Sequence, residues 1–132
     1  MNVLVDTSVW IDYVNNVKDD EQVLKLDSLL TGSDEPVLCP VVYQEVLQGI
    51  RNDTMFSHVK TLLGHFKMLS MDFPRIEDAA VDLYRSLRKK GITIRKSNDC
   101  LIAAYALVYD LPVLFKDRDF EAMVAHSELR AF

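Results

Sequence analysis

Four carboxylate side chains of this 132-residue chain lie next to apolar segments or within them: Asp6, Glu45, Asp99 and Asp117. Two of them follow apolar runs with the character of strands, and two share a face with apolar residues at helical spacing. Carboxylates gathered in one place repel and raise one another's pKa values unless a cation neutralises them. No lysine or arginine is obvious on these helix faces, so we expect a divalent cation. Oxygen ligands favour Mg²⁺ or Mn²⁺ over zinc.

The two acids that follow apolar runs are predicted to lie at one edge of a sheet. The run Val3–Val5 does not alternate with polar residues, which is typical of a strand covered on both faces, and Asp6 ends it. Asp117 lies just past Phe115, the last residue of another apolar run. Ligands of open parallel sheets bind beyond the carboxyl ends of the strands. Both acids therefore indicate a site at that edge.

The positions of apolar residues predict alternating strands and helices. Short apolar runs predict strands at residues 3–5, 37–39, 67–71 and 112–115, and a last strand near 128–132. Apolar spacing of three and four predicts helices at 7–15, 19–31, 41–50, 54–66, 76–89 and 97–110. Thr7 or Ser8 is expected to cap the first helix, and Gly32 and Gly91 to end two others. Helices that separate strands predict an α/β fold with a central parallel sheet and helices on both faces, as one domain over residues 1–132.

Composition and hydropathy are typical of one water-soluble domain. Hydrophobic residues make up 49% of the chain, and no linker, repeat or low-complexity segment interrupts it. The longest apolar run, Cys100–Tyr109, is about half of what a bilayer requires, and Asp6 interrupts the N-terminus too early for a signal peptide. We expect a cytoplasmic protein that does not enter a membrane. Cys39 and Cys100 are expected to be core residues without a disulfide.

Positive charge is concentrated in one stretch of the chain. The formal net charge of -5 counts against a nucleic-acid partner if charge is spread evenly. Six of the fifteen basic residues, however, lie close together with no acid among them: Arg85, Arg88, Lys89, Lys90, Arg95 and Lys96. This basic stretch is either a solvated helix end, where cations are favourable, or a track for phosphates that leads to Asp99.

Each of the four acids also has an ordinary structural interpretation. Asp6 suits a turn or a helix cap, and Asp99 suits the start of a helix. Asp117 lies in a turn-like string, and Glu45 can extend into solvent. The site is absent only if all four interpretations hold at once.

Four segments in order resemble the motifs of PIN-domain ribonucleases, especially the VapC toxins of toxin-antitoxin systems. They are "VLVDTSVW", "VVYQEVLQG", "SNDCLIAAYAL" and "LFKDRDF", and the resemblance covers nearly the whole chain. It implies a three-layer fold and an endoribonuclease that depends on Mg²⁺ or Mn²⁺. The acidic residues of the family correspond to Asp6, Glu45, Asp99 and Asp117. Asp119 resembles an additional acid, and Thr7 or Ser8 a hydroxyl that helps to hold the site.

Hydrolysis of a phosphodiester suits these residue types. The reaction needs a water made nucleophilic near neutral pH and charge relief at the phosphoryl oxygens, and a bound metal supplies both. We assign Asp6, Asp99 and Asp117 mainly to the metal. Glu45 is expected to orient the attacking water, to hold a second metal or to support the ligands from behind. The sequence does not decide whether one metal ion or two take part in the reaction.

The resemblance also implies partners. A VapC-like toxin cleaves RNA, forms a homodimer and is neutralised by a small antitoxin protein. The C-terminal segment of the antitoxin would lie in an apolar groove and reach the acids with a basic residue. Trp10, Tyr13 and Val14 on the first helix are expected to help line that groove.

Four other interpretations remain in view. A phospho-receiver-like signalling module would use Asp6, Asp72 and Lys116, but it leaves Glu45 and Asp99 unexplained. A zinc site would use two histidines seven residues apart, His58 and His65, but no third ligand follows them. Trp10 and Tyr13 are more typical of packing than of base stacking. A purely structural interaction module is disfavoured by the four acids.

Overall fold

A parallel β-sheet lies at the centre of the computed structural model, which describes residues 1–70 and 74–132. The strand β1 (Asn2–Val5) lies between β2 (Glu35–Val37) and β3 (Val113–Leu114), and both pairs are parallel. Two single parallel bridges widen the sheet, from Leu38 to Met68 on the β2 side and from Val113 to Ala131 on the β3 side. All strands therefore direct their carboxyl ends to the same edge.

The central strand is the apolar run at the start of the chain. Leu4 pairs with Val37 on one side and with Val113 on the other. Val3, Leu4 and Val5 have no exposed surface. Helices cover both faces of this strand, so a polar side chain in it would lose its hydration, and the run contains none.

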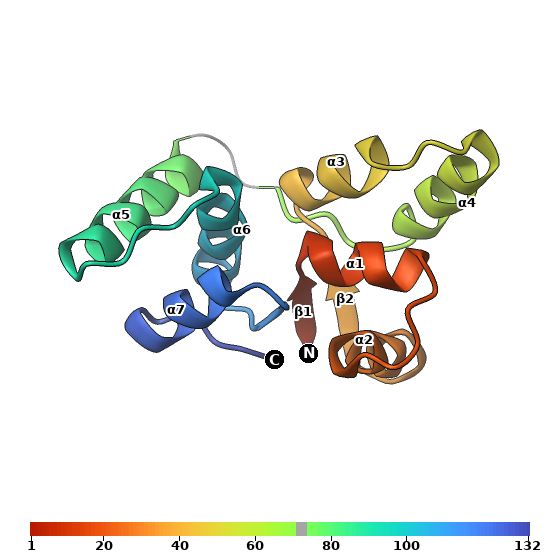
Figure 1. The fold of residues 1–132 in the computed structure, drawn as a ribbon, viewed down its shortest axis with the longest axis horizontal. Coiled ribbons are helices and arrows are strands. Elements are labelled where there is room, and N and C mark those ends of the chain that lie inside the picture. The colour runs from red at the N-terminus through yellow and green to blue at the C-terminus, as the bar shows by residue number, and fades with distance from the viewer. Residues whose placement is uncertain (71–73) are drawn as a thin grey trace.

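Seven helices surround the sheet in the part of the chain that the structure describes. They are α1 (Thr7–Val14), α2 (Glu21–Thr31), α3 (Pro40–Gln48), α4 (Asp53–Leu63), α5 (Arg75–Lys89), α6 (Ser97–Val108) and α7 (Arg118–His126). In Figure 1, α1 to α4 lie on one side of β1 and α5 to α7 on the other. This arrangement confirms the predicted α/β fold with helices on both faces.

The core joins the two helical groups through large apolar side chains. Trp10 has no exposed surface, and its ring packs at a centroid distance of 5.6 Å from Phe66 and 6.3 Å from Tyr13. On the other side, Phe120 stacks on Phe115 at 5.4 Å. The interpretation of Trp10 as a packing residue is confirmed, and its expected place in the lining of an apolar groove is wrong.

Some expected boundaries differ from the structure. The strand expected at 37–39 begins two residues earlier, at Glu35. The strand expected at 67–71 is a bridge at Met68, and its last residue, Met71, lies outside the described residues. The last strand is a bridge at Ala131. These segments pair at single points because neighbouring strands are short.

The helix α7 has no counterpart in the sequence-based expectation. The string "FKDRDF" suggested a turn, but Asp117 caps a helix in which Phe120 and Met123 are buried. Similarly, the cap of α1 is Asp6 and not Thr7 or Ser8. Gly32 does end α2, and Gly91, with a φ of +82°, follows the end of α5.

Two further expectations concern cysteine and the membrane. Cys39 and Cys100 are buried free thiols, and burial raises the pKa of each to about 11. Within residues 1–70 and 74–132, no helix has the length and apolar character needed to cross a bilayer.

Candidate active site

The carboxyl edge of the sheet brings Asp6 and Asp117 to the starts of two helices. Asp6 caps α1: the Ser8 hydroxyl donates to Asp6 Oδ2 at 2.7 Å, and the Ser8 N–H approaches the same atom at 3.4 Å. Asp117 caps α7, since the N–H of Asp119 donates to Asp117 Oδ1 at 2.9 Å. The structural interpretation of Asp6 as a cap is therefore confirmed, and the cap holds its carboxylate at the sheet edge.

Asp99 is the most unusual of the acids. It is the third residue of α6, only 7% of its surface is exposed, and its Oδ2 is buried without a hydrogen-bond partner. Burial raises its pKa to about 7, and the charges of Asp6, Asp117 and Asp119 add to the shift. These three carboxylates thus lie close enough to act on Asp99, and we call the four residues the acidic cluster.

The pKa of Asp6 is raised as well. Burial raises its pKa above the ordinary value, whereas the hydrogen bonds from Ser8 and the helix start lower it. The charge of Glu45 adds to the increase. The structure therefore places Glu45 beside the acidic cluster, as the sequence predicted.

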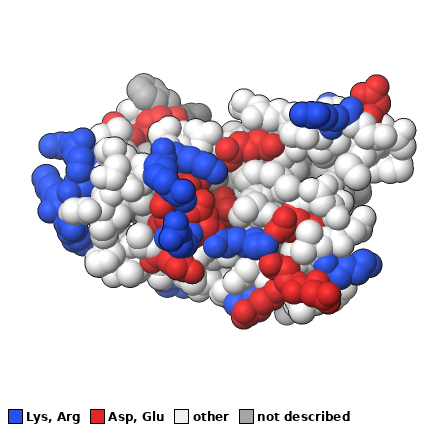
Figure 2. All heavy atoms as spheres, viewed as in Figure 1, with Lys and Arg blue, Asp and Glu red and all other residues white. Residues whose placement is uncertain are grey.

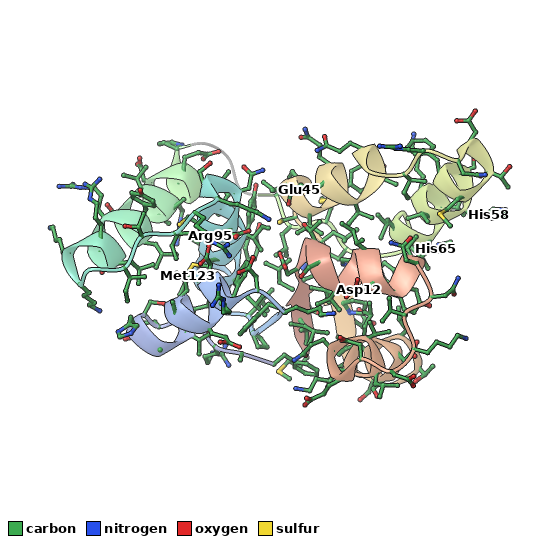
Figure 3. All side chains as sticks on the ribbon, viewed as in Figure 1. Asp12, Glu45, His58, His65, Arg95 and Met123 are labelled. Carbon is green, nitrogen blue, oxygen red and sulfur yellow. The ribbon has the colours of Figure 1, made fainter. Side chains whose placement is uncertain are left out.

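Glu45 is held by two side chains from other elements. The Thr7 hydroxyl donates to Glu45 Oε1 at 2.8 Å, and Asn98 Nδ2 lies 3.5 Å from Oε2. Figure 3 shows Glu45 on α3, near the middle of this face. Asn98 has no part in the sequence-based prediction. Its place directly before Asp99 is the one feature of the sequence that could have pointed to it.

Arg95 contradicts the expectation that no cation faces the acids. Its Nη2 lies 3.2 Å from Asp117 Oδ1, and its Nε lies 3.3 Å from Asp119 Oδ2. Its backbone N–H also donates to Asp119 Oδ2 at 3.2 Å. Arg95 is not on a helix face but in the segment that enters α6, which brings it over the start of α7. Arg95, predicted as part of a phosphate track, therefore lies on the acidic cluster itself.

Lys116 is turned away from the acidic cluster. Its ammonium forms ion pairs with Asp12 on α1 and with Asp20, which caps α2, at 2.6 Å from the latter. The receiver-like interpretation needs this lysine beside Asp6, and the structure gives it other partners. Asp72, which that interpretation also uses, lies outside the described residues.

The basic stretch is divided between two places. At the end of α5, Arg88 lies over the Tyr84 ring at 5.6 Å, and Lys90 donates to the His126 carbonyl at 2.8 Å. Arg95 and Lys96 lie closer to Asp99, and the positive charge of Lys96 lowers the pKa of Asp99. Figure 2 shows acidic side chains gathered in the middle of one face, with basic side chains against them and at the α5 end.

The donors at this edge suit a hard cation. Among the described residues, no three histidine, cysteine or acidic side chains are already placed to hold one ion together. The carboxylates instead bond to groups of the protein: the Ser8 hydroxyl donates to Asp6, and the Arg95 guanidinium donates to Asp117 and Asp119. The unpartnered oxygen of Asp99 and the oxygen-only donor set fit Mg²⁺ or Mn²⁺. His58 and His65 lie near α4, away from the acids (Figure 3), and make no zinc site within the described residues.

A groove of about 860 Å³ lies between α1, α2 and α4. Its lining includes Tyr13 and Val14, as expected, together with Leu24, Met55 and Leu62. Leu24 is 55% exposed, which is high for a leucine. The groove thus presents apolar side chains to solvent on the side of the molecule that carries α1.

Comparison with known proteins gives consistent similarities. Residues 3–125 match the PIN domain family. The VapC ribonuclease Mb1587 of Mycobacterium bovis and the ribonuclease VapC11 of Mycobacterium tuberculosis are each 29% identical over 129 residues, which cover 98% of this chain and 96% of theirs. VapBC2 from Rickettsia felis, solved with a promoter DNA fragment, superposes with a TM-score of 0.79 at 17% identity over 100% of this chain and 98% of that one. VapBC-1 from nontypeable Haemophilus influenzae gives 0.76 at 20%, over 100% and 97%.

The strained carboxylate of Asp99 predicts an unusual pH dependence of stability. Its pKa is about 7 in the fold and 3.8 ordinarily, so the folded chain binds the additional proton between these values. The free energy of unfolding should therefore fall as pH rises from about 4 to about 7. The substitution Asp99→Asn removes this cost and should stabilise the chain by at least about 1 kcal/mol at pH 8 in EDTA, but not at pH 4.

Urea unfolding of both proteins at the two pH values measures this difference. Asp82→Asn is the matched control, because it removes the same charge from an exposed position on α5 and should show no such dependence. A stability difference for Asp99→Asn that is the same at pH 4 and pH 8 would contradict the prediction.

Proposed function

This chain belongs to the PIN domain family, and from that premise we propose that it is a metal-dependent endoribonuclease that acts as the toxin of a toxin-antitoxin pair. The observation that carries the proposal is the buried, unpartnered oxygen of Asp99 among three other carboxylates. A buried carboxylate oxygen without a partner is costly, and a bound cation would compensate it. The names of the curated relatives, VapC ribonucleases, support the assignment of activity.

Asp6, Asp99 and Asp117 are the residues that would hold Mg²⁺ or Mn²⁺. The ion, when bound, would make a water nucleophilic near neutral pH and relieve charge on the phosphoryl oxygens. Asp119 supports the cluster in two ways: its carboxylate accepts from Arg95, and its backbone N–H donates to Asp117 at the start of α7. Glu45, oriented by Thr7 and Asn98, is not assigned to the metal, and it would orient the attacking water.

The basic stretch gives RNA a path to the acidic cluster. Arg85, Arg88 and Lys89 are exposed near the end of α5, and Lys96 lies beside the cluster. Cations in this order offset a net charge of -5 where a phosphate chain would approach. They position the backbone of the RNA without reading its sequence.

The groove between α1, α2 and α4 is the proposed seat of the antitoxin. Its exposed Leu24 and Met55 suit an apolar segment of a partner. The names of similar solved structures, VapBC complexes, support a partner of this class. The position of Arg95 also supports the idea that a guanidinium fits against Asp117 and Asp119, as a basic residue of an antitoxin would. The homodimer and the cytoplasmic location stay predictions.

The first test is cleavage of RNA by the purified chain. We expect cleavage of single-stranded or looped RNA with Mg²⁺ or Mn²⁺, none in EDTA, and a loss of at least about a hundredfold in Asp6→Asn and Asp99→Asn. Asp82→Asn serves as the control for charge, and circular dichroism verifies that each variant is folded. Equal cleavage by the wild type and both site variants would refute the proposed function.

The second test concerns the basic stretch. Replacing Lys89 and Lys90 with alanine should weaken RNA binding in EDTA and reduce the slope of log K against log salt by up to about 1.4, which corresponds to two lost phosphate contacts. Fluorescence anisotropy of a labelled RNA over a salt series measures both. The control, Lys60→Ala with Lys67→Ala, removes two charges elsewhere. An unchanged slope would mean that the stretch is only a solvated helix end.

The third test concerns the groove. Leu24→Asp places a charge on the apolar wall and should weaken binding of the small protein encoded beside this chain by at least about tenfold. Titration calorimetry with the co-expressed and separated partner measures the affinity. Leu24→Met keeps the wall apolar and should bind as the wild type does. Equal affinity for Leu24→Asp would exclude this groove as the antitoxin seat.

A further inference from the structure

The guanidinium of Arg95 covers the outer side of the acidic cluster. Its side chain is 61% exposed, whereas Asp117 and Asp119 beneath it are 23% and 15% exposed. It contacts both acids, at 3.2 Å and 3.3 Å. Among the described residues, it is the one lysine or arginine with an ion pair to the acidic cluster. The cluster therefore has a built-in cation on the side that faces solvent.

The backbone of Arg95 is fixed independently of its side chain. Its N–H donates to Asp119 Oδ2, and the preceding Ile94 is buried in the core. Lys96, the next residue, forms the cap of α6, and Asp99 follows three residues later. When the guanidinium leaves the acids, its Cα stays at the edge of the site. The side chain can then move only within a short radius of Asp99 and Asp117.

Lys116 does not share this freedom. Its two ion pairs, with Asp12 and Asp20, join the end of β3 to α1 and α2, and its side chain is only 30% exposed. It is a structural cation, because its two partners lie on or at the start of other elements of the fold. Unlike Lys116, Arg95 is held by acids of the acidic cluster.

We propose that Arg95 competes with the divalent ion for Asp117, and that its guanidinium, once displaced from Asp117 and the neighbouring Asp119, binds a phosphate of the RNA. This inference rests on the proposed function and adds a residue to it. The side chain uses Nε and Nη2 for the acids in the structure, and three further N–H bonds are available to other acceptors. A planar guanidinium matches the oxygens of a phosphate in pairs, which an ammonium does not.

The charges of the site make the two steps dependent on each other. The acidic cluster carries up to four negative charges, and Arg95 neutralises one of them. A phosphate adds negative charge and is repelled as long as the guanidinium is committed to Asp117 and Asp119. Once a divalent ion binds Asp117 and displaces Arg95, the guanidinium becomes available to the phosphate. The contact between Arg95 and the RNA phosphate therefore forms only when the ion is present.

The test measures Mn²⁺ binding to the whole chain by the electron paramagnetic resonance signal of free Mn²⁺, without RNA. Removal of the competitor by Arg95→Gln should raise the affinity for Mn²⁺ about three- to tenfold, the range expected from two exposed ion pairs. Arg95→Lys keeps the charge but cannot span both acids, so its affinity should lie between those of the wild type and Arg95→Gln.

Arg130→Gln is the matched control for the binding measurement. Arg130 is 53% exposed and pairs with Asp110 at 3.0 Å, before β3 and hence at the opposite edge of the sheet. The substitution removes the same charge and the same kind of ion pair, and should leave the Mn²⁺ affinity unchanged. Thermal melts in EDTA verify that all variants are folded.

A second measurement tests the phosphate step. At saturating Mn²⁺, the KM of Arg95→Gln for RNA should rise about fivefold, with a smaller change in kcat, because one charge-assisted contact to the substrate is lost. Opposite shifts for the two ligands, tighter Mn²⁺ and weaker RNA, are the signature of the proposal. A merely structural role of Arg95 would weaken both.

The outcomes separate this inference from the proposed function. If the wild type does not bind Mn²⁺, the metal site is absent and both fail. If the wild type binds Mn²⁺ and Arg95→Gln binds it equally or more weakly, the competition is refuted while the metal site stands. If the Mn²⁺ affinity rises but the KM for RNA does not, the phosphate step is refuted.

Discussion

The carboxylate of Asp99 is buried on an apolar helix, and burial of a charged group is unfavourable. The side chains around it bear on how this charge is compensated. Its neighbours Cys100, Ile102 and Ala103 pack α6 into the core, so the side chain has little contact with water. One of its oxygens has no hydrogen-bond partner, and burial raises its pKa to about 7. A buried carboxylate is stable only when it is protonated or paired with a cation. The carboxyl edge of the sheet therefore has to supply Asp99 with either a proton or a cation.

The structural and functional interpretations of the acids are compatible. Every helix that follows a parallel strand begins at the same edge of the sheet, and a capping carboxylate is favourable at each such start. Asp6 and Asp117 fill these positions at α1 and α7. The caps fix the two side chains at the edge where Asp99 is buried. Local helix stability thus places the acids together, and an N-terminal cap is not an argument against a role in the site.

The sequence predicted those features that depend on local pattern. The apolar run Val3–Val5 identified the central strand, and the spacing in α5 gave that helix to within one residue. The helix α7 escaped prediction because Asp117 and Asp119 resemble turn residues until Phe120 and Met123 are known to be buried. The groove, the hydrogen bonds of Glu45 and the ion pairs of Arg95 join residues distant in sequence. They follow from the paths of loops and from packing, which no local pattern specifies.

Lys116 and Arg95 differ in how firmly each side chain is tied to the fold. Lys116 holds β3, α1 and α2 together, and it lies between Asp12 and Asp20 with limited exposure, so its charge is committed to the fold. Arg95 lies on the solvent side of two acids in exposed ion pairs, which are individually weak. Exchange of its partners therefore disturbs no element of the fold. In a chain with a net charge of -5, the charge of Arg95 lies directly on the acidic cluster, so the local balance of charge at this edge differs from the total.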